Sequence, residues 1–267
     1  MSLIPGEKTR ISLRRNDDLS RDHIPSGVIE LDRILGGGYP TGAFICVQGD
    51  IGTGTSTFCL QTVWNRLTSG GLATYICMDE LPDTVMKHFR SFGYDIDHYI
   101  DLGRFLLYDG LPLINSLASS SQGQNGVTER KNLLMNFLEE YKSAACAAKK
   151  RNSPITLPSV SVVDSFSSLA PYTDLKAAYV LTHLLADSAR INKNLFLMIV
   201  HTGAIEANIV CACNAVADGI IRLGQLFKRG TLKRVIRIEK LVFTPTPSEL
   251  LEFRITTESG LQIISSI

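Results

Sequence analysis

Short, continuous apolar runs alternate with longer amphipathic stretches along most of this chain. Such runs are typical of strands buried on both faces of a sheet, and the stretches between them are typical of helices. Strands are predicted at 42–49, 72–80, 104–109, 158–170 and 194–203, and helices at 26–36, 56–71, 81–93, 127–152, 174–193 and 206–217. Strands that alternate with helices favour a mostly parallel sheet with helices on both faces.

The C-terminal part of the chain has shorter strand-like segments. Antiparallel strands are predicted near 219–223, 233–243, 251–256 and 260–265, where they would add hairpins to one edge of the sheet. Residues 1–22 are charged without clear periodicity, and residues 115–126 are rich in serine, glycine and asparagine. We therefore expect an N-terminal arm at 1–22, a mobile loop at 115–126 and a single α/β domain at 23–267.

The composition is that of one soluble domain. The chain has 267 residues and is 45% hydrophobic, which suffices for one large core, and its net charge of +1 gives no overall attraction to nucleic acid or an anionic membrane. The first residues lack a signal-peptide core, and the longest wholly apolar run, 195–200, is too short to span a membrane. We expect a cytoplasmic protein with no membrane partner. The six cysteines lack metal-ligand spacing and are interpreted as structural.

A glycine-rich segment, GDIGTGTSTF at 49–58, lies between a predicted strand and a predicted helix. It matches the phosphate-loop pattern G-x-x-x-x-G-K-[ST] except that Thr55 replaces the lysine. The backbone N–H groups of such a loop, together with the dipole of the following helix, bind anions. The candidate nucleotide-binding residues are Gly49, Asp50, Ile51, Gly52, Thr53, Gly54, Thr55, Ser56 and Thr57.

Polar side chains also follow three other predicted strands. In a parallel sheet of this type, ligands bind at the carboxyl ends of the strands. Ser56 stands at the usual position of a Mg²⁺ ligand, and Asp164 stands where a carboxylate would hold the water of that ion. Asp79 or Glu80 could orient an attacking water as general base, and His201 could sense a phosphate.

Each of these features also has a purely structural explanation. Many glycine-rich turns bind nothing, acids at strand ends are often solvated or cap the next helix, and a lone histidine is more often structural than functional. The occurrence of all of them in the right order favours a nucleotide site.

The chain resembles the KaiC-like branch of the RecA-type ATPases. Beside the loop at 49–56, the resemblance is carried by IPSGVIELDRILGGGYPTG (24–42), YICMDELP (75–82), VVDSFSSL (162–169), VADGIIRL (216–223) and FRITTESGLQI (253–263). It implies a RecA-like fold, a ring or filament of identical subunits, and ATP bound between them.

The same resemblance assigns roles by position. The loop would be the Walker A motif, Asp164 the Walker B acid, and Asp79 and Glu80 the paired catalytic glutamates, the first shortened to aspartate. Lys240 would be offered to the phosphates of a neighbouring subunit.

Two positions depart from the family pattern. Thr55 stands in place of the Walker lysine, and Val242 stands where the family often has an arginine. Both changes remove positive charge near the γ-phosphate. A lost charge-assisted contact costs roughly 1.5–3 kcal/mol, which is about ten- to a hundredfold in affinity. The transition state should lose more, because charge is spread over the transferring phosphoryl group. We therefore expect weak binding of ATP with Mg²⁺, little or no hydrolysis, and action through oligomerisation or an unidentified protein partner.

Three other functions remain open. A pseudo-ATPase could serve as an interaction module without binding nucleotide. An active ATPase could replace the missing cation, with Lys240 of a neighbouring copy as the candidate. A recombinase-like protein could bind nucleic acid through the basic segment 222–240, although a solvated strand face is the simpler interpretation and Phe227 is the segment's lone stacking aromatic.

Overall fold

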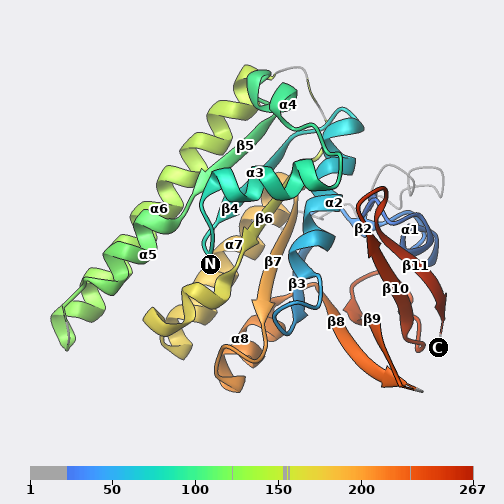
Figure 1. Ribbon diagram of the computed structural model, residues 1–267. Coiled ribbons are helices and arrows are strands. Elements are labelled where there is room, and N and C mark those ends of the chain that lie inside the picture. The colour runs from blue at the N-terminus through green and yellow to red at the C-terminus, as the bar shows by residue number, and fades with distance from the viewer. Residues whose placement is uncertain (1–22, 122, 153–154, 156, 229, 267) are drawn as a thin grey trace, which may run out of the picture.

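In the computed structural model, a nine-stranded sheet crosses the molecule, and a separate ribbon pairs β1 (His23–Ile24) with β2 (Tyr39–Pro40) (Figure 1). The structure describes residues 23–121, 123–152, 155, 157–228 and 230–266, so the predicted arm at 1–22 lies outside the described residues. The strands of the large sheet are β3 (Phe44–Gly49), β4 (Ala73–Cys77), β5 (Phe105–Asp109), β6 (Val160–Asp164), β7 (Leu195–His201), β8 (Gly219–Lys228), β9 (Thr231–Leu241), β10 (Leu251–Thr256) and β11 (Gly260–Ser266).

The strand order of this sheet is β11-β10-β9-β8-β3-β7-β6-β4-β5. Neighbours from β8 to β5 are parallel, and neighbours from β8 to β11 are antiparallel. The predicted fold class, a mostly parallel α/β sheet with C-terminal hairpins at one edge, is confirmed. The prediction for the first hairpin strand was partly wrong, because 219–223 pairs in parallel with 45–49 while its other side pairs antiparallel with β9. Strand β8 therefore joins the parallel core to the hairpins.

Helices cover both faces of the sheet. They are α1 (Ile29–Ile34), α2 (Thr55–Thr68), α3 (Pro82–Ser91), α4 (Asp97–Asp101), α5 (Leu111–Ala118), α6 (Gln124–Arg151), α7 (Leu175–Asn192) and α8 (Ala207–Val216). The prediction of a loop over the whole of 115–126 was wrong, because α5 continues to Ala118 and α6 already begins at Gln124. Leu113 and Leu117, one helical turn apart, are both buried and hold α5 against the sheet. Figure 1 shows α5 and α6 together along the side of the molecule opposite β10 and β11.

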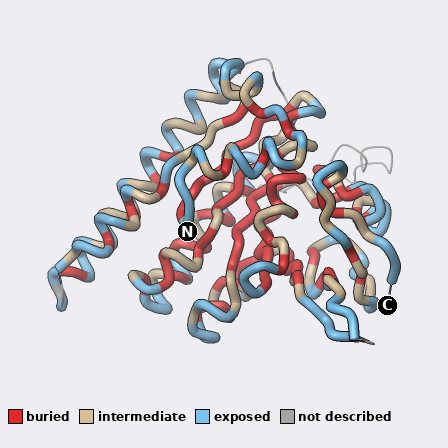
Figure 2. Tube along the Cα trace, viewed as in Figure 1, coloured by how far each residue is buried: buried red, intermediate tan, exposed pale blue. Residues whose placement is uncertain are grey.

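The sheet separates two apolar cores. Ile45 and Val47 of β3 face the core shared with α2, α3 and the hairpins, whereas Phe44 and Cys46 face the core shared with α5 to α8. Burial on both faces explains why the central strands are continuous apolar runs in the sequence (Figure 2). Among the described residues, we find no helix that combines the length and the apolar character needed to cross a bilayer.

The strand predicted at 158–170 ends earlier than expected, at Asp164. Two short 3₁₀ turns follow it, at Phe166–Ser168 and Ala170–Tyr172. Phe166 and Leu169 are buried in the second core, so the chain turns down onto the sheet instead of extending it. This early turn leaves the side chain of Asp164 at the carboxyl edge of the sheet.

Replacing Arg66 with methionine is expected to raise the free energy of unfolding. Arg66 of α2 is only 5% exposed, and its Nε and Nη2 atoms have no hydrogen-bond partner among the described residues. Burial lowers the pKa of this guanidinium, so its charge is disfavoured in the fold. An unsatisfied buried polar group costs about 1–3 kcal/mol, and an apolar side chain of similar length avoids that cost.

Urea denaturation of Arg66→Met would measure this gain. The matched control is Arg90→Met, because Arg90 is exposed and paired with Asp97 at 2.7 Å, a class of pair worth little. A less stable Arg66→Met protein would contradict the prediction and would show that the guanidinium has a partner in the folded protein.

Candidate functional site

The loop between β3 and α2 requires glycine at two of its pattern positions. A Cβ atom at Gly49 would lie 2.5 Å from Thr53 Oγ1 and 2.7 Å from the carbonyl oxygen of Leu223. Gly54 caps α2 with a left-handed backbone, φ +105°, and a Cβ there would lie 2.8 Å from Cδ1 of Ile255. The loop is therefore packed closely between β8 and the hairpin strand β10.

Short polar contacts fix the shape of this loop. The backbone N–H and the hydroxyl of Thr53 both donate to the carbonyl oxygen of Asp50, at 3.2 and 2.7 Å. The hydroxyl of Thr202, just after β7, donates to Asp50 Oδ1 at 3.1 Å, and the Thr202 N–H donates to the Gly49 carbonyl at 3.3 Å. The residue after β7 thus forms hydrogen bonds with both the backbone and the Asp50 carboxylate at the start of the loop.

Thr55, the residue in place of the expected lysine, is buried at the first position of α2. Its Cγ2 atom lies 3.1 Å from the place that a Cβ at Gly49 would occupy, so its methyl group lies inside the turn of the loop. Residues 49–57 contain no lysine or arginine. The predicted phosphate loop therefore has no basic side chain of its own.

Three predicted site residues come together at the ends of neighbouring strands. Asp164 ends β6, His201 ends β7, and Asp79 follows β4, and these strands are adjacent in the order β7-β6-β4. One potential ligand atom from each of the three lies within 4.8 Å of the others. His201 Nε2 lies 3.9 Å from Asp79 Oδ2.

Burial raises the pKa of the Asp164 carboxyl, because the charged form loses water. Hydrogen bonds from the hydroxyl groups of Tyr75 and Ser56 oppose this effect, and the nearby Asp79 charge adds to it. Ser56, the predicted metal ligand on the loop, thus lies near the predicted Walker B acid.

Asp79 is held by two serines that the sequence analysis did not single out. The hydroxyl of Ser165 donates to Asp79 Oδ2 at 2.8 Å, and the hydroxyl of Ser168 donates to Asp79 Oδ1. Ser167, between them, accepts the backbone N–H of His201 at 2.8 Å through its hydroxyl. The only available signal was the run of serines after the strand, which a local reading assigns to a turn.

Glu80 and Lys240 are not brought to the loop within one chain. Glu80 points to the exposed imidazole of His88, with Oε2 and Nδ1 3.5 Å apart. The Lys240 ammonium donates to the carbonyl oxygen of Ala217, and Lys240 is paired with Ile220 near the start of β8. The loop begins at Gly49, which is level with Leu223, further along β8. Lys240 therefore lies away from the loop, toward the start of that strand.

The hairpins supply neighbours of the loop that sequence reasoning missed. Gln225 Nε2 of β8 lies 3.5 Å from the Gly52 carbonyl oxygen, and the ring of Phe253 of β10 lies 3.8 Å from the place of a Cβ at Gly54. Arg234 of β9 is paired with both Gln225 and Phe253. Because paired residues project from the same face of a sheet, the Arg234 side chain lies on the loop's face. Its Nε is buried without a hydrogen-bond partner in the described part of the chain.

The basic segment 222–240 is less basic as a surface than as a sequence. Arg222 is paired with Glu239 at 2.8 Å, and Lys233 is paired with Glu252 at 2.6 Å. These pairs neutralise two of the cations that a nucleic-acid backbone would need. Arg237 is exposed, so the segment is not left without positive charge.

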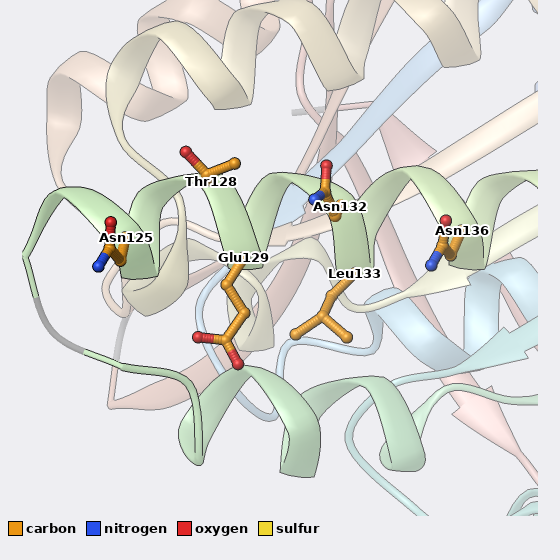
Figure 3. A pocket seen from close by; sticks show the side chains of 6 residues that line it. All are labelled: Asn125, Thr128, Glu129, Asn132, Leu133 and Asn136. Carbon is orange, nitrogen blue, oxygen red and sulfur yellow. The ribbon is translucent and has the colours of Figure 1, made fainter.

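Two hollows elsewhere do not belong to this site. One, of about 450 Å³, lies along the first turns of α6 and is lined by Asn125, Thr128, Glu129, Asn132, Leu133 and Asn136 (Figure 3). Another, of about 520 Å³, includes Thr74 and Ser161 near the amino ends of β4 and β6, away from the loop. Neither contains a residue of the loop or of the Asp79, Asp164 and His201 cluster.

A family model described as the KaiC ATPase matches residues 24–266. The chain belongs to the KaiC ATPase family. A solved structure of a KaiC-like protein from Pyrococcus horikoshii superimposes with a TM-score of 0.71 at 19% identity, covering 91% of this chain and 99% of that one. This likeness shows the shared fold, and it confirms the expected KaiC-like RecA-type architecture.

Similarity to individual relatives covers only part of each chain. A UPF0273 protein of Thermotoga maritima is 33% identical over 86 residues, which are 32% of this chain and 36% of that protein. A UPF0273 protein of Saccharolobus solfataricus is 29% identical over 139 residues, 52% of this chain and 46% of that protein. The circadian clock oscillator protein KaiC of Thermosynechococcus vestitus is 31% identical over 90 residues, 33% of this chain and 17% of that protein. The matched segments thus span less than half the length of each relative.

Membership of the KaiC family points to ATP and Mg²⁺ in general. The residues present fit these groups in part. The loop backbone and the Ser56–Asp164 pair are built as a phosphate and metal site would require, whereas the cation expected at position 55 is replaced by a buried threonine.

Proposed function

We propose that this protein binds ATP with Mg²⁺ weakly, hydrolyses it slowly or not at all, and acts by assembling with copies of itself or by binding a protein partner. The observation that carries the proposal is the loop itself. Gly49 and Gly54 are packed where no side chain fits, the metal-ligand position Ser56 lies near the strand-end acid Asp164, and the cation position holds Thr55. Such a loop can bind phosphate through its backbone but stabilises its charge less well.

The residues divide into three roles under this proposal. The N–H groups of 49–57 would bind the phosphates, and Ser56 with Asp164 would hold Mg²⁺, which neutralises phosphate charge when bound. Asp79 is positioned by Ser165 and Ser168 to hold a water near Asp164. The carboxylate of Glu80 lies 3.5 Å from the exposed imidazole of His88, so Glu80 is not placed to hold a water near Asp164 within this chain.

Assembly would explain the position of Lys240. Its ammonium lies beyond the start of β8 on the Ala217 carbonyl, so it would contact phosphate only on a neighbouring copy. The ring or filament that the resemblance to KaiC-like ATPases implies supports this arrangement. Val242 would offer no second cation from that neighbour, which supports slow hydrolysis.

Titration calorimetry with a slowly hydrolysed ATP analogue and Mg²⁺ tests the proposal, together with a phosphate-release assay. We expect measurable but weak binding and little turnover. Turnover at rates ordinary for the family would overturn the proposal in favour of an active ATPase. No binding at millimolar analogue would overturn it in favour of an interaction module.

Replacing Arg234 with glutamine is expected to weaken binding of the analogue by about tenfold or more, the value of one charge-assisted contact. Arg234 lies between two residues that reach the loop, and its guanidinium is the cation that the hairpins add to that face. Calorimetry of the variant measures the effect.

The matched control for this prediction is Arg237→Gln. Arg237 is on the same strand but stands opposite Arg222 in the register of β8 and β9, so its side chain projects from the opposite face of the sheet. Equal losses in the two variants would show that only net charge matters, and unchanged affinity in Arg234→Gln would show that this arginine does not serve the site.

A further inference from the structure

We propose that Asp79, Asp164 and His201 bind a first-row transition-metal ion such as Mn²⁺ or Co²⁺ directly, in the absence of nucleotide. This site shares Asp164 with the proposed Mg²⁺ position at Ser56, but it adds Asp79 and His201, so its ligands are two carboxylates and an imidazole from three strand ends. Their potential ligand atoms lie within 4.8 Å of one another, a spacing that a single ion can bridge with small side-chain movements.

The imidazole of His201 is the first reason. Its side chain is only 15% exposed, yet neither ring nitrogen makes a hydrogen bond to any residue that the structure describes. Nδ1 is buried without a partner, and Nε2 lies 3.9 Å from Asp79 Oδ2, beyond hydrogen-bond distance. An ion between the imidazole and the carboxylates would be bound by Nε2, the nitrogen that lies 3.9 Å from Asp79 Oδ2.

Uncompensated negative charge is the second reason. Within the described ranges, neither Asp79 nor Asp164 forms an ion pair with a lysine or arginine. Two carboxylates this close repel each other, and the partly buried one has lost part of its hydration. A divalent cation between them would remove both penalties.

The groups around the carboxylates form the third reason. Hydroxyl groups of Ser165 and Ser168 hold both oxygens of Asp79, and the Tyr75 hydroxyl holds one oxygen of Asp164. The Ser167 hydroxyl fixes the backbone of His201 at 2.8 Å. Hydrogen bonds of this kind orient the ligands in metal sites and account for a large part of their affinity.

The ligand set selects the class of ion. Carboxylates alone suit Mg²⁺ and Ca²⁺, whereas an imidazole favours transition metals, so Mn²⁺ or Co²⁺ should bind more tightly than Mg²⁺. Three protein ligands leave coordination positions for water or for a phosphate oxygen. On the basis of the proposed function, such an ion would also bring positive charge beside Ser56, where Thr55 supplies none.

Paramagnetic resonance of Mn²⁺ added to the nucleotide-free, full-length protein tests the site. Titration measures the free ion and hence the dissociation constant, and pulsed spectra detect the ¹⁴N nucleus of a coordinated imidazole. We expect one bound Mn²⁺ with ¹⁴N coupling, which a tenfold excess of Mg²⁺ does not displace. His201→Gln should lose the coupling and bind at least about tenfold more weakly, since even losing a group that only orients a ligand costs about 10–100-fold.

The matched control is His88→Gln, which removes an imidazole that lies beside a carboxylate at 3.5 Å but outside the cluster. It should bind Mn²⁺ like the wild type and keep the ¹⁴N signal. No binding to the wild type at millimolar Mn²⁺ would overturn the proposal, and so would binding without ¹⁴N coupling. Because no nucleotide is present, either failure leaves the proposed ATP binding untouched, and a failure to bind ATP leaves the metal site untouched.

If His201→Gln does not fold, Asp79→Asn offers a second variant. The oxygen of asparagine can accept from one of Ser165 and Ser168, and its NH2 group can donate to the hydroxyl of the other, so the variant should fold but lose the charge and with it Mn²⁺ affinity. Unchanged affinity in Asp79→Asn would overturn the assignment of this ligand and with it the three-residue site.

Discussion

Replacing Thr55 with lysine is expected to strengthen binding of an ATP analogue by about ten- to a hundredfold, the value of one charge-assisted contact of roughly 1.5–3 kcal/mol. Thr55 is the first residue of α2, and its methyl group lies inside the turn of the loop, where the lysine of the phosphate-loop pattern is expected. A longer side chain at that position would carry its ammonium toward the mouth of the loop. Calorimetry with the analogue and Mg²⁺ measures the change.

Thr55→Met is the matched control for this charge. Methionine has nearly the length of lysine without its charge, so it should not strengthen binding. Equal gains in both variants would attribute the effect to shape. Weaker binding in Thr55→Lys, with an unchanged melting temperature, would contradict the view that the loop is a phosphate site that has lost its cation. Hydrolysis is expected to stay slow in this variant, because Val242 still lacks the second cation.

Replacing Asp164 with asparagine is expected to stabilise the protein while abolishing its Mg²⁺-dependent binding of nucleotide. Burial raises the pKa of Asp164 in the folded state, so the folded protein holds that proton more tightly than the unfolded chain. The associated stability is fully present below the unfolded pKa and is lost as the pH rises through the folded pKa. At pH 7 the wild type therefore carries an unfavourable charge that asparagine removes.

Melting curves at pH 4 and pH 7 test whether the charge of Asp164 destabilises the folded protein. The gain in melting temperature, at about 2–4 °C for each kcal/mol, should be larger at pH 7 than at pH 4. Glu258→Gln is the control, since Glu258 is exposed in the turn before β11 and should show no such pH dependence. An Asp164→Asn protein that is less stable at pH 7 would show that the hydrogen bonds from Tyr75 and Ser56 outweigh the loss of hydration.

The sequence was sufficient for features that depend on local pattern. Continuous apolar runs located the parallel strands, because burial on both faces leaves no polar positions in them. The loop could be identified because glycine is required where Gly49 meets Leu223 and where Gly54 meets Ile255. The placement of Asp164 at the end of β6 followed from the same apolar run.

Features that depend on pairing or on a turn could not be read from the sequence. Asp79 and Glu80 are adjacent, and only the turn after β4 decides that Asp79 meets Asp164 while Glu80 meets His88. Arg234 looked like one cation in a basic run, because its face depends on the register of three strands. The segment 115–126 looked like a loop because its polar residues obscure the buried Leu117.

The close packing of Gly54 against Ile255 has a consequence for biosynthesis. During synthesis on the ribosome, β3 and the loop are made early. The residues of β10 that pack against the loop are in place only after β10 has been made and has paired with β9. Contacts between residues so far apart in sequence form late and slowly. The nascent loop must therefore wait for nearly the whole domain before its surroundings are complete.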